Sequence, residues 1–284
     1  MLGCYRNDCM ADEWCCVMGD KEKHDMHFIC GKEEENKNKK QSWGSKIIRM
    51  FCEKAADIFY PRRCPICDDV LESGILICEK CYGQVQNVKE PVCKRCGKPL
   101  EYEREEYCTD CQKGTHVYRQ GKAVFLYKEG IRQSMYRFKY SNRREYATFY
   151  AKEAAKLYGD WVKKNHIEVI VPIPMYQGKK RRRGYNQAEV FAQALGEELK
   201  LPVNGKIVRR VRDTRPQKEL NDRERRNNLK NAFQFKPNIV KYKQILLVDD
   251  IYTTGSTVDT VADVLLSGGA QAIYYICISI GAGF

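Results

Sequence analysis

The chain has 284 residues, 15 cysteines and a formal net charge of +13 at pH 7. That length accommodates one mid-sized domain and a smaller one, and the charge favours a polyanionic partner such as nucleic acid over a purely solubilising role. No apolar run approaches the roughly 20 residues of a membrane-spanning helix, and the N-terminus has no apolar signal segment. We therefore expect a cytoplasmic protein without a membrane span.

Residues 1–45 form a cysteine-rich extension that we expect to be mobile. Its cysteines, from Cys4 to Cys30, match no metal-ligand spacing, so their role stays open. The run GKEEENKNKKQS within it is typical of a solvated linker. Residues 46–60 then carry apolar residues at helical spacing, which predicts a helix leading into the next module.

Four C-x-x-C pairs occupy the module at residues 46–116. In a cytosolic protein, such cysteines favour metal binding over disulfides, and two pairs complete one tetrahedral, structural zinc site. The simplest pairing joins the first two pairs in one site and the last two in the other, while an interleaved pairing stays open. We predict a double zinc ribbon with two zinc ions rather than a redox motif. The predicted ligands are Cys64, Cys67, Cys78, Cys81, Cys93, Cys96, Cys108 and Cys111.

Strands and helices alternate through residues 117–284. Apolar runs predict strands at 123–127, 168–175, 245–250 and 272–280, and helical spacing predicts one or two helices within 135–164 and another over 188–200. This alternation predicts an α/β fold with a parallel sheet, whose ligands lie beyond the carboxyl ends of the strands. The strand ends near residues 172–174 and 249–250 should therefore face the same crevice.

The stretch ILLVDDIYTTGSTV, residues 245–258, combines an acid pair with a hydroxyl-rich turn. A helix should open near Ser256 or Thr257, with a hydroxyl side chain as its N-cap. The strand, the tight turn and this helix start form a phosphate cradle of backbone amides and hydroxyls. The acids would repel phosphate but can accept hydrogen bonds from a vicinal diol, so we predict a sugar-phosphate site. The alternative is an Asx turn that caps an ordinary helix. The site residues are Asp249, Asp250, Thr253, Thr254, Gly255, Ser256 and Thr257.

Residues 245–257 resemble the phosphoribosyl-pyrophosphate (PRPP) motif of type I phosphoribosyltransferases. The resemblance implies that the acids hold the ribose hydroxyls and have a catalytic role, and that the loop holds the 5-phosphate of PRPP or another ribose-5-phosphate compound. It also implies Mg²⁺ bridging the ligand and a flexible catalytic loop at 209–231. The implied pyrophosphate loop is Pro172, Ile173, Pro174 and Met175.

Three further motifs, KKRRRGYNQAE (179–189), RFKYSNRREYA (137–147) and the segment 209–233, together with the zinc pairs, resemble the ComF/ComFC competence family. The resemblance implies a cytoplasmic protein that handles incoming single-stranded DNA. Its implied partners are the competence helicase and other DNA-uptake proteins, through which it would reach a membrane DNA-uptake complex. Tyr140 and Tyr185 are candidates for stacking on bases, with a core role as the alternative. The expected nucleic-acid or phosphate contacts are Lys179, Lys180, Arg181, Arg182, Arg183, Arg225 and Arg226.

Two function classes stay open at this point. The basic runs and the zinc module favour DNA handling, although a basic run such as residues 179–183 is commonly just a solvated loop. The PRPP motif favours an active phosphoribosyltransferase that uses PRPP and Mg²⁺, although the small hood that reads the base in such enzymes is not recognisable. A purely structural zinc scaffold leaves the acids and the TTGST turn unexplained. The acceptor, turnover and oligomeric state do not follow from the sequence.

Overall fold

The computed structural model describes residues 61–114, 116–213, 232–235 and 241–281. All of them belong to one compact unit, Ala55–Phe284. The expectations for the extension at 1–45, the helix at 46–60 and the segment 214–231, with Arg225 and Arg226, lie outside the described residues. In the part that is described, no helix has the length and apolar character needed to cross a membrane.

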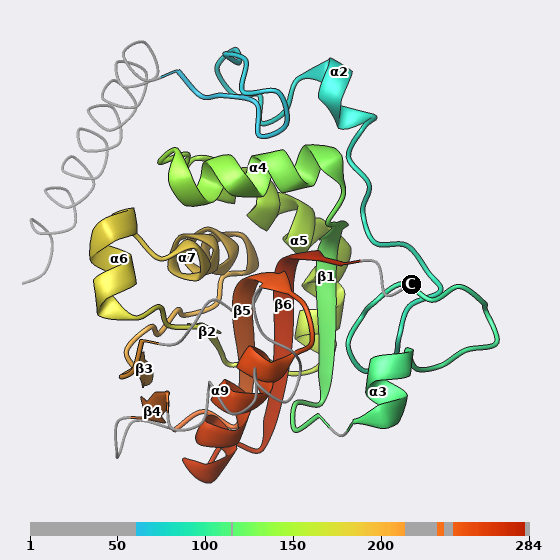
Figure 1. Ribbon diagram of the computed structural model, residues 1–284, viewed down its shortest axis with the longest axis vertical. Coiled ribbons are helices and arrows are strands. Elements are labelled where there is room, and N and C mark those ends of the chain that lie inside the picture. The colour runs from blue at the N-terminus through green and yellow to red at the C-terminus, as the bar shows by residue number, and fades with distance from the viewer. Residues whose placement is uncertain (1–60, 115, 214–231, 236–240, 282–284) are drawn as a thin grey trace, which may run out of the picture. The chain divides into compact units, whose positions relative to one another are not determined.

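Four parallel strands form the central sheet in the order β1–β6–β5–β2 (Figure 1). They are β1 (Gln120–Leu126), β2 (Val169–Pro172), β5 (Gln244–Tyr252) and β6 (Ala272–Ile280). Val248 lies opposite Pro172 on one side and Ile276 on the other. The acid pair and the predicted pyrophosphate loop therefore lie at the carboxyl ends of neighbouring strands. This arrangement confirms the predicted parallel α/β fold.

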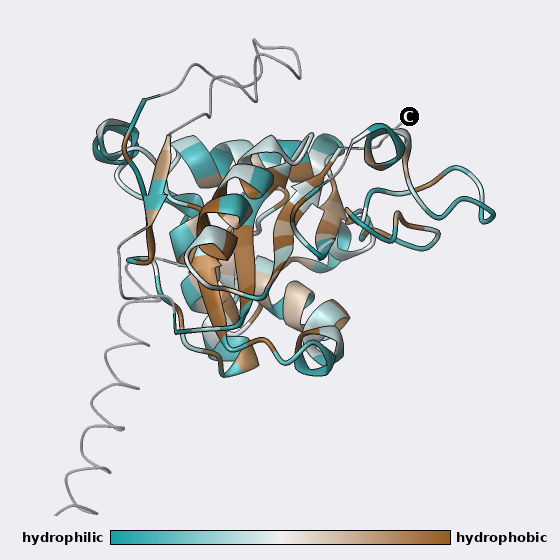
Figure 2. Cartoon of the chain, turned by 90° about the horizontal axis from the view of Figure 1, so that it is seen from below, coloured by the Kyte–Doolittle hydropathy of each residue, from teal (hydrophilic) through white to brown (hydrophobic). Residues whose placement is uncertain are grey.

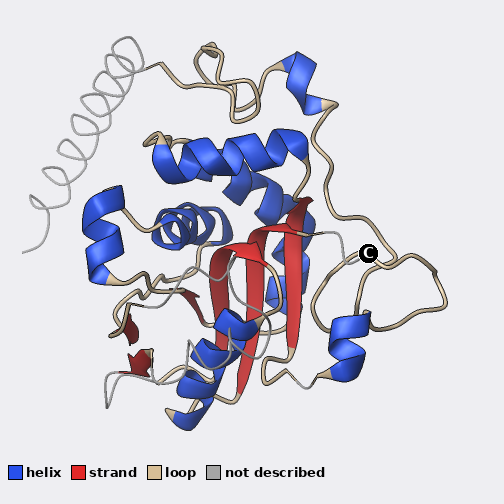
Figure 3. Cartoon of the chain, in the orientation of Figure 1, coloured by secondary structure: helices blue, strands red, loops and turns tan. Residues whose placement is uncertain are grey.

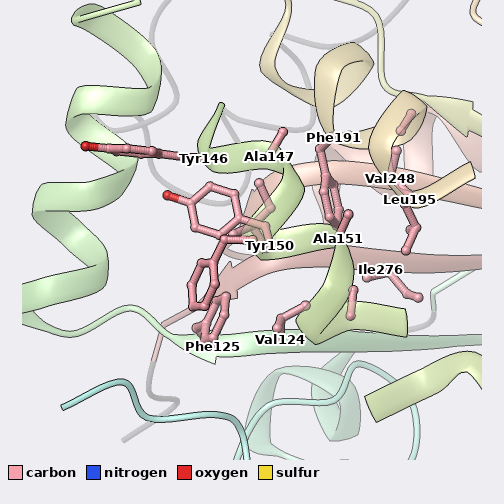
Figure 4. Packing of buried hydrophobic residues seen from close by; sticks show 14 of the residues in the cluster. Val124, Phe125, Tyr146, Ala147, Tyr150, Ala151, Phe191, Leu195, Val248 and Ile276 are labelled. Carbon is pink, nitrogen blue, oxygen red and sulfur yellow. The ribbon is translucent and has the colours of Figure 1, made fainter. Parts of the chain in front are cut away.

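Helices cover both faces of this sheet (Figure 3). They are α4 (Glu129–Tyr140), α5 (Tyr146–Lys164), α7 (Gln187–Leu199) and α9 (Ser256–Ser267), whereas the short helix α6 (Gln177–Arg183) has no buried residues. Successive β5 residues alternate between two cores: Leu246 joins the core of α4, α5 and α7, and Leu247 joins that of α9. Figure 4 shows the first core, with Phe191 and Leu195 of α7 beside Val248. Burial on both faces explains why the strand is continuously apolar.

The zinc module divides into two halves that pack against different faces of the sheet. Ribbon 1 (residues 64–81) carries α2 (Glu79–Tyr82), and its Cys64, Ile66 and Cys81 belong to the core of α4 and α5. Ribbon 2 (residues 93–111) carries α3 (Thr109–Lys113), and its cysteines belong to the core of α9. Between them, the backbone of Gln86 and Val88 hydrogen-bonds to edge strand β1, which covers that edge.

Two local expectations are corrected by the structure. The basic run at 179–183 is part of helix α6 rather than a loop, and Gly184 ends the helix in the left-handed conformation at φ 88°. Helix α9 begins at Ser256 as expected, but its N-cap is Gly255, and no side chain caps it. Figure 2 shows α6 as a mainly hydrophilic helix, in contrast to the brown strands of the sheet.

A second, two-stranded antiparallel sheet pairs β3 (Val208–Arg210) with β4 (Phe233–Phe235). Val208 and Phe233 are buried in the core of α9, so this small sheet is anchored to the main domain. The intervening residues 214–231 lie outside the described part. The small sheet brings Arg209 and Arg210 to the carboxyl edge of the main sheet, where they line a cavity with the predicted pyrophosphate loop.

Candidate functional site

The acid pair lies near the carboxyl end of β5, and both side chains are partly buried. The backbone N–H of Asp250 donates to Asp249 Oδ1 at 2.8 Å, which orients the first carboxylate. Lys139 of α4 reaches Asp250 Oδ2 at 2.7 Å, and each of these two side chains is 18% exposed. Helix α4 therefore supplies a positive charge that compensates one member of the pair.

The two carboxylates differ in their electrostatics. Burial and the neighbouring charge of Asp250 raise the pKa of Asp249 to about 7, while the charges of Lys139 and Arg210 oppose that rise. Asp249 therefore exchanges its proton near neutral pH. A ligand hydroxyl that donates to this carboxylate would favour its ionised form, because hydrogen bonds to a carboxylate stabilise the charge.

The hydroxyl-rich turn lies between the acid pair and α9. Gly255 has φ +81°, and a Cβ on it would lie 2.5 Å from the Tyr252 hydroxyl and 3.1 Å from His116 Cε1. Glycine is therefore required here both by the backbone conformation and by the close packing. Thr254 Oγ1 and Ser256 Oγ lie 2.9 Å apart. The N-cap residue Gly255 has no side chain to cap α9, so the positive end of the helix opens on the hydroxyl-rich turn.

The predicted pyrophosphate loop has fewer free amides than expected. Pro172 and Pro174 have no N–H, and Ile173 donates to Val248 O at 2.9 Å within the sheet. Among these four described residues, Met175 alone is left with an amide outside the sheet pairing. Asn186, which caps α7, donates its amide to Ile173 O at 3.0 Å and holds the loop in place. Its position just before an amphipathic helix could have indicated the cap, but not this second contact.

A cavity of about 500 Å³, which we call the α6 cavity, lies beside this loop. Its walls come from the loop, α6, the start of α7 and strand β3, and they include Met175, Lys180, Arg209 and Arg210. Burial lowers the pKa of Arg210, and the negative charge of Asp249 opposes this effect. Arg210 therefore connects the cavity with the acid pair. Arg209 and Arg210 give its walls cationic groups that can meet an anionic ligand.

A second cavity of about 440 Å³, the α4 cavity, lies beside helix α4. It is lined by the side of α4 that carries Tyr136, Lys139 and Tyr140, together with Tyr127 after β1 and Ile251 of β5. Lys139 thus both lines this cavity and binds Asp250. Sequence reasoning identified Lys139 only as part of a motif, because its pairing with Asp250 spans more than a hundred residues.

The basic residues expected to contact phosphate have unequal surroundings. Lys180 pairs with Glu189 at 2.5 Å, Lys179 pairs with Asp213 at 2.8 Å, and the Arg183 guanidinium lies 4.9 Å from the Tyr140 ring centre. Arg181 and Arg182, in contrast, are exposed on α6. These two arginines are therefore the members of the run best placed to meet an external phosphate.

The two tyrosines that are candidates for stacking on bases differ in their burial. Tyr185 is buried and donates to the backbone oxygen of Phe138, so it belongs to the core. Tyr140 is exposed, as a stacking surface would require.

The basic residues of ribbon 2 have partners within the chain. Lys94 pairs with Glu106, Lys98 pairs with Asp110, and Arg95 donates to the backbone oxygen of His116. Each of these three ribbon cations is thus engaged within the chain.

A polar cluster that the sequence did not predict packs against the hydroxyl-rich turn. His116 Nδ1 lies 2.6 Å from Asp259 Oδ2 in the first turn of α9, and the Val117 amide donates to the other oxygen at 3.1 Å. The His116 ring stacks on Tyr118, whose hydroxyl lies 2.7 Å from that of Tyr252. Because Arg95 binds His116 O, this cluster connects ribbon 2 with the start of α9. A single histidine after the zinc module carried no signal of this role.

The eight predicted ligands gather into two groups of four: the first two C-x-x-C pairs form one, and the last two form the other. In each group the sulfur atoms lie within 4.8 Å of one another. Cys67 Sγ lies 3.7 Å from Cys78 Sγ, and Cys96 Sγ lies 3.5 Å from Cys108 Sγ. A tetrahedral zinc site with bonds of about 2.3 Å needs sulfurs about 3.8 Å apart, so both groups fit structural zinc. The sequential pairing is the one the structure adopts.

Comparison with protein families gives two matches. A model described as "Phosphoribosyl transferase domain" matches residues 151–281, and one described as "Double zinc ribbon domain" matches residues 55–112. They agree with the observed parallel sheet and with the two cysteine groups. The matches therefore support both predicted modules, the double zinc ribbon and the phosphoribosyltransferase-like domain.

Comparison with curated proteins gives relatives named for competence or DNA use. The chain is 42% identical over 108 residues to "Competence protein F" of Haemophilus influenzae, covering 37% of this chain and 47% of the relative. It is 39% identical over 109 residues to "DNA utilization protein YhgH" of Escherichia coli (strain K12), covering 38% and 48%. Against "Competence protein ComFC" of Bacillus subtilis (strain 168) it is 27% identical over 154 residues, covering 54% and 61%. The chain thus spans about half the length of the first two relatives.

Proposed function

The chain belongs to the ComF/ComFC family, and on that premise we propose that it acts in DNA uptake, handling incoming single-stranded DNA on a fold that binds PRPP. The observation that carries this proposal is the meeting of an acid pair, an uncapped helix start and a basic helix at one edge of the sheet. The names of the relatives support the competence role. Cytoplasmic localisation, the competence helicase and other uptake proteins belong to the same proposal.

PRPP matches the chemistry of this edge. The diol would bind the carboxylates of Asp249 and Asp250, and the 5-phosphate would bind the amides and hydroxyls around Thr254 and Ser256. The pyrophosphate would occupy the α6 cavity, where Arg210 is one of the cations. Mg²⁺ would accompany the pyrophosphate and neutralise its charge. The acid pair offers the oxygen donors that this ion prefers, although Asp250 already has Lys139 as a partner.

Calorimetric titration of the full-length protein with PRPP and Mg²⁺ tests the ligand. Replacing the acid pair in an Asp249→Asn/Asp250→Asn variant should weaken binding about 10- to 100-fold, because two charged acceptors of the diol are lost. The control variant is Asp160→Asn, which removes an exposed carboxylate on α5 and should bind normally. Circular dichroism should show both variants folded. Unchanged PRPP affinity in the double variant would exclude this pocket.

A working phosphoribosyltransferase is the second candidate function. The specific observation in its favour is that each of two cavities is lined by a cation that interacts with the acid pair: Arg210 in the α6 cavity and Lys139 in the α4 cavity. The first would suit a leaving pyrophosphate, and the second would be available to an acceptor. In such an enzyme the acids would stabilise positive charge on the ribosyl centre as pyrophosphate leaves. Incubation with PRPP, Mg²⁺ and a panel of bases or oligonucleotides, followed by measurement of pyrophosphate, separates the candidates. Acceptor-dependent release supports the enzyme, and its absence supports a binding platform.

A further inference from the structure

The α4 cavity has no role in PRPP binding as proposed above. Its volume of about 440 Å³ lies within the range of about 300–1,000 Å³ that is typical of small-ligand sites. It reaches the acid pair through Lys139 and Ile251, so a ligand in it would lie next to the sugar site. The cavity therefore calls for an occupant of defined chemistry.

Two large aromatic side chains line this cavity and are left exposed. Tyr136 is 62% exposed and Tyr140 is 61% exposed, although other aromatic residues of the same core are fully buried. They lie one helical turn apart on α4, and their ring centres are 5.0 Å apart with the planes at 46°. A single exposed tyrosine needs no explanation, but a contiguous pair in a cavity is typical of a binding surface.

The charged residues that line the cavity are all cations, although Arg132 and Lys139 pair with Glu129 and Asp250 just outside the lining. Arg132, Arg137 and Lys139 line it, and none of the lining residues that the structure describes there carries a carboxylate. Arg183 of α6 lies over the Tyr140 ring and donates to its hydroxyl at 3.3 Å. The aromatic pair is therefore continuous with α6, on which Arg181 and Arg182 are exposed.

From these contacts we propose that the α4 cavity binds a nucleobase, stacked on Tyr136 beside Tyr140. The inference rests on the proposed function and adds to it the position at which a base is held. Single-strand binding proteins combine a positive surface for the backbone with aromatic side chains on which bases stack. Here α6 supplies the positive surface, α4 supplies the aromatic surface, and Arg183 joins them. A free nucleobase has the same ring chemistry, so the test distinguishes the two sources.

The test uses the full chain and a short oligothymidylate that carries one 2-aminopurine, whose fluorescence is quenched on stacking. Tyr136→Leu keeps a helix-forming, apolar side chain but removes the ring, and it should weaken binding about 5- to 100-fold and reduce the quenching. Tyr136→Trp keeps a stacking ring and should retain both signals. Tyr82→Leu removes a tyrosine that is 56% exposed on ribbon 1 and should behave as wild type. An oligonucleotide of abasic sites should bind both Tyr136 variants equally.

The outcomes separate this inference from the function on which it rests. If wild type binds the normal oligonucleotide and Tyr136→Leu binds it equally well with full quenching, the base site is wrong while DNA handling stands. If wild type binds no oligonucleotide, the DNA function fails, and the second arm decides with free 2-aminopurine riboside. Quenching of the riboside that depends on Tyr136 would assign the cavity to a free base. Absence of quenching with both ligands would overturn the nucleobase site.

Discussion

At the scale of single residues, the acid pair has an asymmetry that the pattern DD does not reveal. Asp250 has a lysine partner at 2.7 Å, whereas Asp249 has a pKa raised to about 7 by burial and by the charge of Asp250. Near neutral pH the Asp249 carboxyl is therefore only partly ionised. This asymmetry has a measurable effect on stability.

The stability of the protein should fall as pH rises from about 4 to 7 because of Asp249. Its folded-state pKa lies above its unfolded value, so the folded state binds more protons in that window and loses stability as they leave. Asp249→Asn removes this titration and should be more stable than wild type at pH 8, by at most about 4 kcal/mol, with a smaller difference at pH 5. Thermal unfolding of both proteins at the two pH values measures the effect.

The matched control for this prediction is Asp160→Asn, because that carboxylate is exposed on α5. Any loss of zinc at low pH would affect all three proteins alike and cancel in the comparison. If wild type and Asp249→Asn differed by the same amount at pH 5 and pH 8, the raised pKa of Asp249 would be wrong.

The sequence indicated the acids and the turn, because strand, acids, hydroxyls and glycine are adjacent in the chain. It could not indicate Lys139 or His116, since both reach the site through contacts between distant segments. The expected hydroxyl cap on α9 was wrong for a related reason. The turn places Gly255 at the cap in a conformation with positive φ, which leaves Thr254 and Ser256 hydrogen-bonded to each other.

At the scale of elements, the strands were easier to predict than α6. Strands β5 and β6 are buried on both faces, so their long apolar runs identified them directly. Helix α6 has no buried residues, and without an apolar stripe it lacks the signal that marks an amphipathic helix. Its end at Gly184 was the available indication, but a glycine after a basic run fits a loop equally well.

The two ribbons are the elements whose stability should depend on metal. We expect two zinc ions per chain, because each group of four thiolates forms a closed tetrahedral site. Cys78→Ser and Cys108→Ser should each retain about one zinc and unfold the ribbon concerned, since metal binding supplies folding free energy to such modules. Elemental analysis of freshly reduced protein measures the zinc. Wild type with no zinc would contradict the prediction.

The same two variants should differ in PRPP affinity. Ribbon 2 contacts the sheet through Tyr275, which donates to Cys96 O at 2.6 Å, and contacts the α9 cluster through Arg95 and His116. Ribbon 1 contacts α4 and α5 instead: Arg137 of α4 donates to Ile66 O, and the Tyr146 hydroxyl of α5 donates to Asp68 Oδ1 at 2.6 Å. Cys108→Ser should therefore weaken PRPP binding more than Cys78→Ser. Equal losses would show that the His116 cluster does not carry the effect.

At the scale of the whole molecule, the basic residues behind the net charge of +13 differ in how far they are neutralised by partners within the chain. Several cations are used within the fold: Lys139 binds Asp250, Lys180 binds Glu189, and the ribbon 2 cations have partners of their own. Arg181 and Arg182 remain exposed on α6, beside the tyrosine pair of α4. Among the described residues, Arg181 and Arg182 are therefore exposed cations that a nucleic acid backbone can reach.

We expect single-stranded DNA to bind with little sequence preference and with an affinity that falls steeply with salt. The logarithm of affinity should change with the logarithm of salt concentration by about −0.7 for each phosphate neutralised on a single strand. If Arg181 and Arg182 each neutralise one phosphate, Arg181→Gln/Arg182→Gln should flatten the slope by about 1.4. Fluorescence anisotropy of a labelled oligothymidylate at several salt concentrations measures it.

The control for this experiment changes the net charge equally at another place. Lys163→Gln/Lys164→Gln removes two exposed cations at the end of α5, beside the amino end of β2, and should keep the wild-type slope. Glutamine is used in both variants because it favours helix about as well as lysine and arginine do. If the active phosphoribosyltransferase is correct instead, the α6 variant should leave the slope unchanged. Equal flattening by both variants would show that net charge, rather than α6, determines DNA binding.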